Sequence, residues 1–170
     1  MGSTELLADA FERVRDGIHP AVNGLTAEQL AFRPDTESNS IAWLAWHLTR
    51  IQDDHVAHLA GTGQRWLDGG WAERFALPLD PSDTGYGHDP AQVALVVAGA
   101  RDLLDYFEDV HTATLAYLAA IGEDDLDRVI DTRWDPPVTV QVRLVSVVAD
   151  DLQHVGQAAY LRGLVHRRPD

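Results

Sequence analysis

The chain contains no cysteine and no lysine. Without cysteine there can be no disulfide, iron–sulfur cluster, thiolate metal site or cysteine nucleophile, so any thiol chemistry must use a thiol supplied by a ligand. Without lysine there is no Schiff-base chemistry on a lysine amine. Arginine provides all 13 basic residues against 27 acidic ones, and the formal net charge is −14. This balance disfavours a nucleic-acid partner, because binding to a phosphate backbone depends on clustered positive charge.

The sequence also lacks long apolar runs. None approaches the roughly 18 residues that a membrane span needs, and Met1–Leu7 lacks the basic start and apolar stretch of a secretory signal. We therefore expect a cytoplasmic protein without a membrane partner. A hydrophobic share of 45% and five tryptophans in 170 residues are enough for a packed core. No internal repeat or boundary divides the chain, which predicts one domain over residues 1–170.

Hydrophobic residues recur at helical spacing in four long segments. Ser40 is suited to cap the second of them, and Asp89 followed by proline is suited to cap the third. Val97 is expected in the buried stripe of the third helix. The predicted helices run over residues 4–22, 41–60, 90–121 and 140–165.

The connections between these helices are informative as well. Those over residues 64–88 and 123–139 are longer than the two to eight residues that usually join antiparallel neighbours, which indicates crossovers. A short helical turn is expected over residues 26–30, and the alternation over residues 138–142 also fits a short strand. The sequence predicts an all-α fold, a four-helix bundle with long crossover loops.

The last predicted helix carries polar side chains beside its apolar stripe. A helix turns by about 100° per residue, so Val147 and Ala158 lie within about 40° of His154, which places this histidine on the core-facing stripe. Asp150 lies one turn earlier and about 40° to one side, whereas Asp151 lies about 60° to the other side. A carboxylate and an imidazole four residues apart can hold one metal ion.

Catalytic zinc sites typically use three His or carboxylate ligands and keep one position open. A further ligand would therefore have to come from another helix of the bundle. His47 is the best candidate, because Leu44 and Ile51 place it beside the core stripe of the second predicted helix. His55 and His58 extend the same face and are alternative ligands, although exposed histidines are the simpler interpretation.

Several of these residues have simpler explanations than a functional site. A histidine on an apolar helical face is more often a hydrogen-bonded core residue than a ligand, which applies to His47 and to His111. Arg143 lies on the flank of Asp150 and could contact a ligand, but fits a surface salt bridge. Trp66 and Trp71 could line a pocket wall, but packing is their default role. The remaining histidines fit loop or terminal positions: His19, His88 and His166.

Two segments resemble the DinB-like, or YfiT-like, superfamily of four-helix metalloproteins. They are residues 39–48, which end in Trp-His-Leu, and residues 150–157. Residues 150–157 resemble that family's H-x3-H-x-G-Q element with the first histidine replaced by Asp150. A carboxylate there is similar to the mycothiol-dependent maleylpyruvate isomerase branch, whose metal site is His, Glu and His. The resemblance covers nearly the whole chain and implies His47, Asp150 and His154 as metal ligands, with Asp151 or a water as substitutes if the short Asp150 does not reach the ion.

The same resemblance implies an enzyme, a thiol S-transferase that depends on a divalent metal and a low-molecular-weight thiol. Zn²⁺ is the expected ion, with Ni²⁺ or Fe²⁺ as alternatives, and mycothiol is the expected thiol. A thiol bound to the ion would lose its proton and attack an electrophile, in detoxification. The alternatives are a thiol-dependent isomerase, a metal-dependent hydrolase, and a non-enzymatic, stress-related dimeric bundle. The expected partners are a small-molecule thiol, an electrophile and a second copy of the chain.

Overall fold

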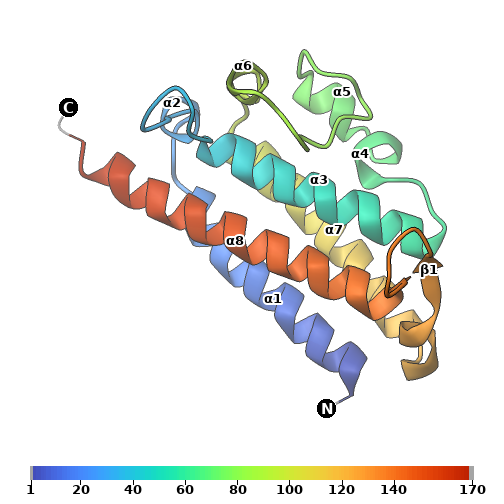
Figure 1. The fold of residues 1–170 in the computed structure, drawn as a ribbon. Helices are drawn as coiled ribbons and strands as arrows, with labels where there is room; N and C mark the ends of the chain where they lie inside the picture. The colour runs from blue at the N-terminus through green and yellow to red at the C-terminus, as the bar shows by residue number, and fades with distance from the viewer. Residues whose placement is uncertain (1, 169–170) are drawn as a thin grey trace.

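Four amphipathic segments form the long helices of the computed structural model, which describes residues 2–168 (Figure 1). Helix α8 packs against both α3 and α1, and α7 packs against the same two helices. The order around the bundle is therefore α3, α8, α1, α7, and the predicted all-α four-helix bundle is confirmed. The bounds of these helices are Ser3–Val22 for α1, Ile41–Ala60 for α3, Ala100–Ala120 for α7 and Val140–His166 for α8.

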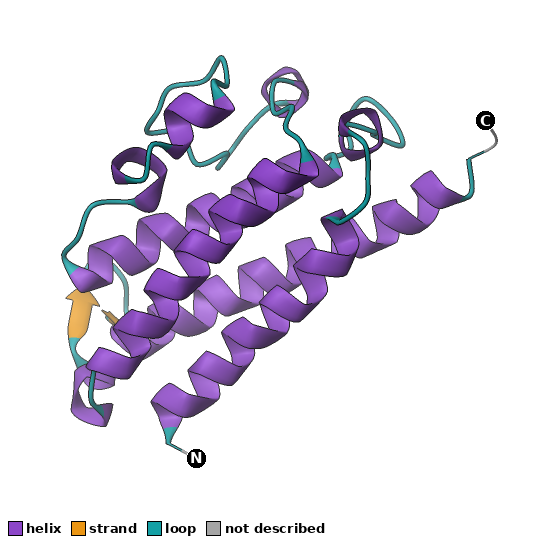
Figure 2. Cartoon of the chain, turned by 180° about the vertical axis from the view of Figure 1, so that it is seen from behind, coloured by secondary structure: helices purple, strands orange, loops and turns teal. Residues whose placement is uncertain are grey.

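The connections contain short elements rather than plain loops (Figure 2). The sequence around Val138 fits either a strand or a helix, and the structure contains both. Strand β2 pairs with β1 antiparallel, and Thr139 then caps α8 by accepting a hydrogen bond from the Val142 amide. The short elements are α2 (Ala27–Leu30), α4 (Arg65–Asp68), α5 (Trp71–Phe75), α6 (Pro90–Ala94), the 3₁₀ helix η1 (Glu123–Asp127), β1 (Val129–Asp131) and β2 (Val138–Thr139).

The helix predicted over residues 90–121 is broken. Asp89 caps α6 as expected, but α6 ends at Ala94, and α7 begins only after Gly99, which has an extended backbone. The β-branched pair at 96–97 and the glycine two residues after it have low helix propensity. The break places the side chain of Val96 in the core, with 1% exposure. Val97 is 54% exposed, so its predicted place in the buried stripe is wrong.

Helix α3 is the most enclosed part of the bundle. Every residue from Ile41 to Arg50 is buried, because α7 and α8 cover two sides and the connection from α3 to α6 contributes Trp66 and Phe75 to the same core. His47 therefore lies in the interior without leaving its helix. No helix formed by the described residues is long and apolar enough to cross a membrane. The assignment of residues 1–170 to a single domain remains a prediction.

The start of α3 can be tested through its cap. The buried Ser40 hydroxyl accepts a hydrogen bond of 3.1 Å from the Trp43 amide. We expect Ser40→Ala to lower the free energy of unfolding by about 1 kcal/mol, because one amide at the helix start loses its partner. For a chain of this size the melting temperature should fall by about 2–4 °C in circular dichroism. Ser146→Ala is the control, because that exposed hydroxyl only donates to the Val142 carbonyl within α8. Equal losses in both variants would contradict the capping role.

Candidate metal centre

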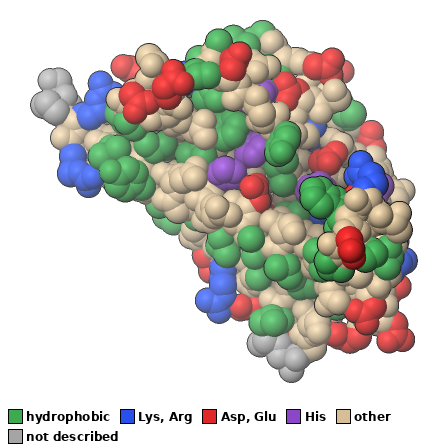
Figure 3. Space-filling view, viewed as in Figure 1, with side chains coloured by type: hydrophobic (Ala, Val, Ile, Leu, Met, Phe, Trp, Pro, Cys, Tyr) green, Lys and Arg blue, Asp and Glu red, His purple; other side chains and the backbone are tan. Residues whose placement is uncertain are grey.

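His47 from α3 meets Asp150 and His154 from α8 at the interface of the two helices. Each side chain offers one ligand atom, and these atoms all lie within 4.8 Å of one another. His154 Nε2 lies 3.6 Å from Asp150 Oδ1, and the rings of the two histidines are 5.0 Å apart between centroids. Within residues 2–168 no other group of three such side chains comes together in this way. Figure 3 shows histidine side chains reaching the surface between α3 and α8, beside an acidic side chain.

The His47 ring is held in one orientation. Its Nδ1 lies 2.6 Å from the Thr84 carbonyl oxygen, which can only accept, so Nδ1–H donates and Nε2 keeps its lone pair. The indole of Trp43 stacks on the ring at 4.5 Å between centroids. Burial lowers the pKa of the His47 imidazole and so favours the neutral form, which is the form that binds metals. An imidazole fixed by a carbonyl on its far nitrogen is typical of metal ligands.

The two residues from α8 complete a set of metal-binding atoms. His154 Nδ1 lies 3.2 Å from Gln157 Oε1, and donation to that oxygen leaves Nε2, on the Asp150 side, as the free nitrogen. Asp150 Oδ2 is buried and has no hydrogen-bond partner among the described residues. An unpartnered buried carboxylate oxygen is costly, and a cation beside it would remove that cost. Two neutral imidazoles and one carboxylate are also a ligand set that catalytic zinc uses. The residues fit a divalent ion.

His88, in the connection between α5 and α6, supports this cluster. The Trp43 indole N–H donates to His88 Nδ1 at 3.1 Å, so the neutral His88 ring must carry its proton on Nε2. That Nε2 donates to Asp83 Oδ2 at 2.9 Å, and the His88 side chain is only 2% exposed. Partial burial alone would raise the pKa of the Asp83 carboxyl, but the bonds from His88 and the Gly85 amide lower it. The indole of Trp43, which stacks on His47, is therefore held in place by His88.

The backbone around Asp83 is fixed by two further contacts. The fully buried Arg50 donates from Nε to the Asp83 carbonyl at 3.1 Å, and the Gly85 amide donates to Asp83 Oδ1 at 2.8 Å. Gly85 has a φ of +87°, and a Cβ there would lie 2.8 Å from His47 Nδ1. Residues 83–88 therefore form a support that presents the Thr84 carbonyl to His47. Sequence reasoning missed this support, and the two glycines at positions 85 and 87 were its only local signal.

The alternative carboxylate does not join the cluster. Asp151 is fully buried within the bundle, and neither carboxylate oxygen has a hydrogen-bond partner among the described residues. Burial, and to a lesser degree the charge of Asp150, raise the pKa of the Asp151 carboxyl well above its usual value. The group of potential ligands contains Asp150 and not Asp151.

The other candidate ligands lie outside the cluster as well. Arg143 Nη1 lies 3.3 Å from His55 Nδ1, and burial followed by this positive charge lowers the pKa of His55. Arg143 also lies 4.0 Å from Asp131 Oδ2, at the limit of an ion pair. His58 is exposed. His111 is 3% exposed and stacks on the ring of Phe107 in the bundle interior.

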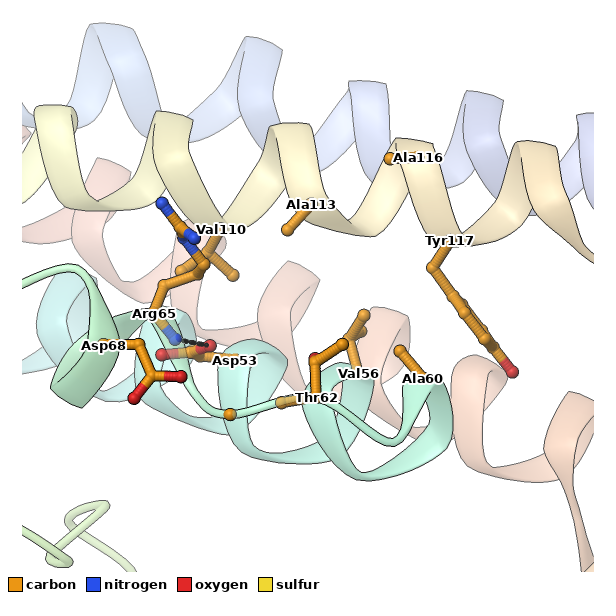
Figure 4. Close-up of a pocket in the computed structure, with 12 residues that line it drawn as sticks. Asp53, Val56, Ala60, Thr62, Arg65, Asp68, Val110, Ala113, Ala116 and Tyr117 are labelled. Carbon is orange, nitrogen blue, oxygen red and sulfur yellow. Dashed lines mark hydrogen bonds between the residues drawn. The ribbon is translucent and has the colours of Figure 1, made fainter.

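The two tryptophans of the long connection serve in packing. Trp66 is 3% exposed within the core, and the Trp71 indole donates to Asp109 Oδ2 at 2.8 Å. A separate cavity of about 340 Å³ lies between α3 and α7 (Figure 4). Of its two carboxylates, Asp53 and Asp68, the first already accepts from the amides of Arg65 and Trp66 and from the Tyr106 hydroxyl. No predicted ligand lines this cavity.

The four-helix bundle and the His–Asp–His cluster between its second and fourth long helices define the chain as a DinB-like protein. The family model described as mycothiol-S-transferase matches residues 6–166. The chain belongs to the mycothiol S-transferase family. It is also similar to a solved structure described as the conserved protein of locus from Enterococcus faecalis, with 36% identity, 99% of each chain covered and a TM-score of 0.92. None of the curated proteins compared with the chain matches it.

Proposed function

We propose that this protein is a metal-dependent enzyme that joins mycothiol, through its sulfur, to electrophiles, in detoxification. The observation that carries the proposal is the cluster of His47, Asp150 and His154 in a chain that has no cysteine of its own. Membership of the mycothiol S-transferase family supports thiol transfer at the family level. The metal, the electrophile and the detoxification role go beyond that and are part of the proposal.

His47, Asp150 and His154 would hold the ion, expected to be Zn²⁺. Such an ion lowers the pKa of a thiol bound to it and thereby makes the thiolate available at neutral pH. The chain itself contributes orientation and charge. The Thr84 carbonyl and Gln157 fix the two imidazoles, and the one carboxylate would leave the site with a net positive charge that attracts a thiolate.

The alternatives remain a thiol-dependent isomerase, a hydrolase and a non-enzymatic bundle. The first two use the same three side chains, and they differ from the transferase in what they consume. A hydrolase needs water and no thiol, and an isomerase returns its thiol unchanged. A cytoplasmic location and a homodimer are further predictions that belong with this proposal.

Metal removal tests the proposal directly. We expect about one ion per chain by mass spectrometry, and mycothiol loss with an electrophile such as monobromobimane. Stripping the ion with a chelator should lower the rate by about a hundredfold or more, and Zn²⁺ should restore it. The melting temperature should fall in parallel, because an ion present at a thousand times its Kd stabilises a protein by about 4 kcal/mol.

Two controls separate the alternatives. Turnover that persists without any thiol would indicate the hydrolase, and turnover that requires mycothiol without consuming it would indicate the isomerase. A protein that carries no ion and melts at the same temperature with or without chelator would contradict every enzymatic version and leave the structural bundle.

A further inference from the structure

A cavity of about 460 Å³ lies along α8, beside the candidate metal centre. Gln157 belongs to both, because its Oε1 lies 3.2 Å from His154 Nδ1 and its side chain lines the cavity. Leu44, one turn before His47 on α3, lines the cavity from the opposite helix. None of the three proposed ligands lines the cavity, but Gln157 and Leu44 place it next to the cluster. Its volume lies in the range of small-molecule sites.

The cavity has the shape of an elongated site. Its lining on α8 begins at Gln157 and ends at Leu164, ten residues beyond His154. At 1.5 Å per residue this is about 15 Å along the helix. A molecule that reaches the cluster with one end and fills the cavity must therefore be long, with its reactive atom at one end and its body along α8.

The side chains that line the cavity favour an uncharged, hydroxyl-rich part of a ligand. Pro34 and Leu164 provide apolar surface, and Ser38 and Asn39 provide hydrogen-bonding groups from the segment before α3. Tyr160, 67% exposed, presents an aromatic ring at the edge. This combination suits a sugar-like body, whose C–H faces pack on apolar and aromatic side chains while its hydroxyls bind polar groups.

The charges argue against an acidic occupant. Over the described part of the chain, Glu37 is the one charged residue of the lining, and no cation faces the cavity. The net charge of −14 adds a field that repels anions. A carboxylate-rich thiol would be bound poorly here, whereas mycothiol, whose cysteine is joined to a neutral sugar and cyclitol, has the required shape and chemistry.

We propose that this cavity binds the neutral, hydroxyl-rich body of the thiol cosubstrate, and that Tyr160 is the side chain on which that body packs. The inference rests on the proposed function for the identity of the thiol. It assigns binding of the thiol body to α8 and the segment before α3, and it leaves the electrophile to approach the cluster from elsewhere.

Tyr160→Ala tests the assignment in the metal-loaded enzyme. We expect the KM for mycothiol to rise about five- to tenfold with kcat nearly unchanged, the size of effect that one or two lost contacts produce. The KM for a truncated neutral thiol, N-acetylcysteinamide, should not change, because that thiol does not reach the cavity. Leu152→Ala is the control on the same helix, since Leu152 is 42% exposed and does not line the cavity. A rise in the KM for the electrophile instead of the thiol would overturn the assignment.

A binding experiment separates this inference from the proposed function. The thiol-free, N-acetylated sugar–cyclitol body is titrated into zinc-loaded protein while the amide resonances of residues 157–164 are followed by NMR. We expect shifts that saturate in the wild type and need about five times more ligand in Tyr160→Ala. Saturating shifts without any thiol transfer would refute the proposed function and keep the cavity assignment. Thiol transfer without shifts at these residues would refute the assignment alone.

Discussion

His154→Ala should abolish both metal binding and thiol transfer. The substitution removes one of the three proposed ligands. Structural zinc binds with roughly 10–16 kcal/mol, so the loss of one ligand in three should cost about 4 kcal/mol, or about a thousandfold in affinity. Alanine is the best helix former, so α8 should persist, which circular dichroism can verify. Zinc affinity is measured by competition with a chromophoric chelator, and the rate by mycothiol consumption.

His58→Ala is the matched control for that experiment. His58 lies on α3, is exposed, and is not part of the cluster. The substitution removes a histidine, and with it the nonspecific metal affinity of one imidazole, without touching the proposed ligands. We expect wild-type affinity and rate in this variant. An unchanged rate in His154→Ala would end the proposed mechanism, whatever His58→Ala does.

Gly85→Ala should weaken metal binding without removing any ligand. The added Cβ would lie 2.8 Å from His47 Nδ1 and 2.9 Å from the Trp46 ring, closer than real Cβ contacts allow. His47 would have to move and its hydrogen bond to the Thr84 carbonyl would lengthen. Loss of such a supporting contact typically costs about 10–100-fold in metal affinity, and we expect about that loss here, measured by the same chelator competition.

The chain provides an unusually close control for this variant. Gly87, two residues later, has a φ of +76°, but a Cβ there would meet no atom within 4 Å. Gly87→Ala therefore carries the same backbone strain of about 1–2 kcal/mol without the contact to His47. We expect the melting temperature to fall in both variants, and further in Gly85→Ala because the clash adds to the strain, whereas zinc affinity should fall in Gly85→Ala alone. Equal zinc affinities in the two variants would show that the contact at Gly85 does not position His47.

The helices and the cluster could be predicted because their signals are local. The 3.6-residue period placed His154 and Asp150 on one flank of α8, and the two motifs pointed to His47 as their partner. The break before Gly99 was missed because the apolar pattern of residues 93–107 fits an unbroken helix. Asp151 was placed correctly by angle, but its complete burial depends on how closely α1 and α3 approach α8.

The support around His47 could not be predicted, for a different reason. Asp83, Thr84 and His88 lie more than 30 residues from His47 along the chain and follow no periodic pattern. Their positions depend on the path of the whole connection from α3 to α6, and that path is determined by tertiary contacts such as Arg50 to the Asp83 carbonyl. His88 is therefore predicted as an ordinary loop residue, and the sequence shows no sign that its ring is enclosed between tryptophans.

The cluster joins two helices that are far apart in the chain, because His47 and Asp150 are separated by more than 100 residues. An ion bound there would act as a cross-link between α3 and α8 and would oppose every opening that separates them. The ligands cannot converge in an unfolded chain, so the binding energy of the ion would count in full toward keeping the bundle closed. Susceptibility to proteolysis, and with it the lifetime of the protein in the cell, would then follow the concentration of free metal.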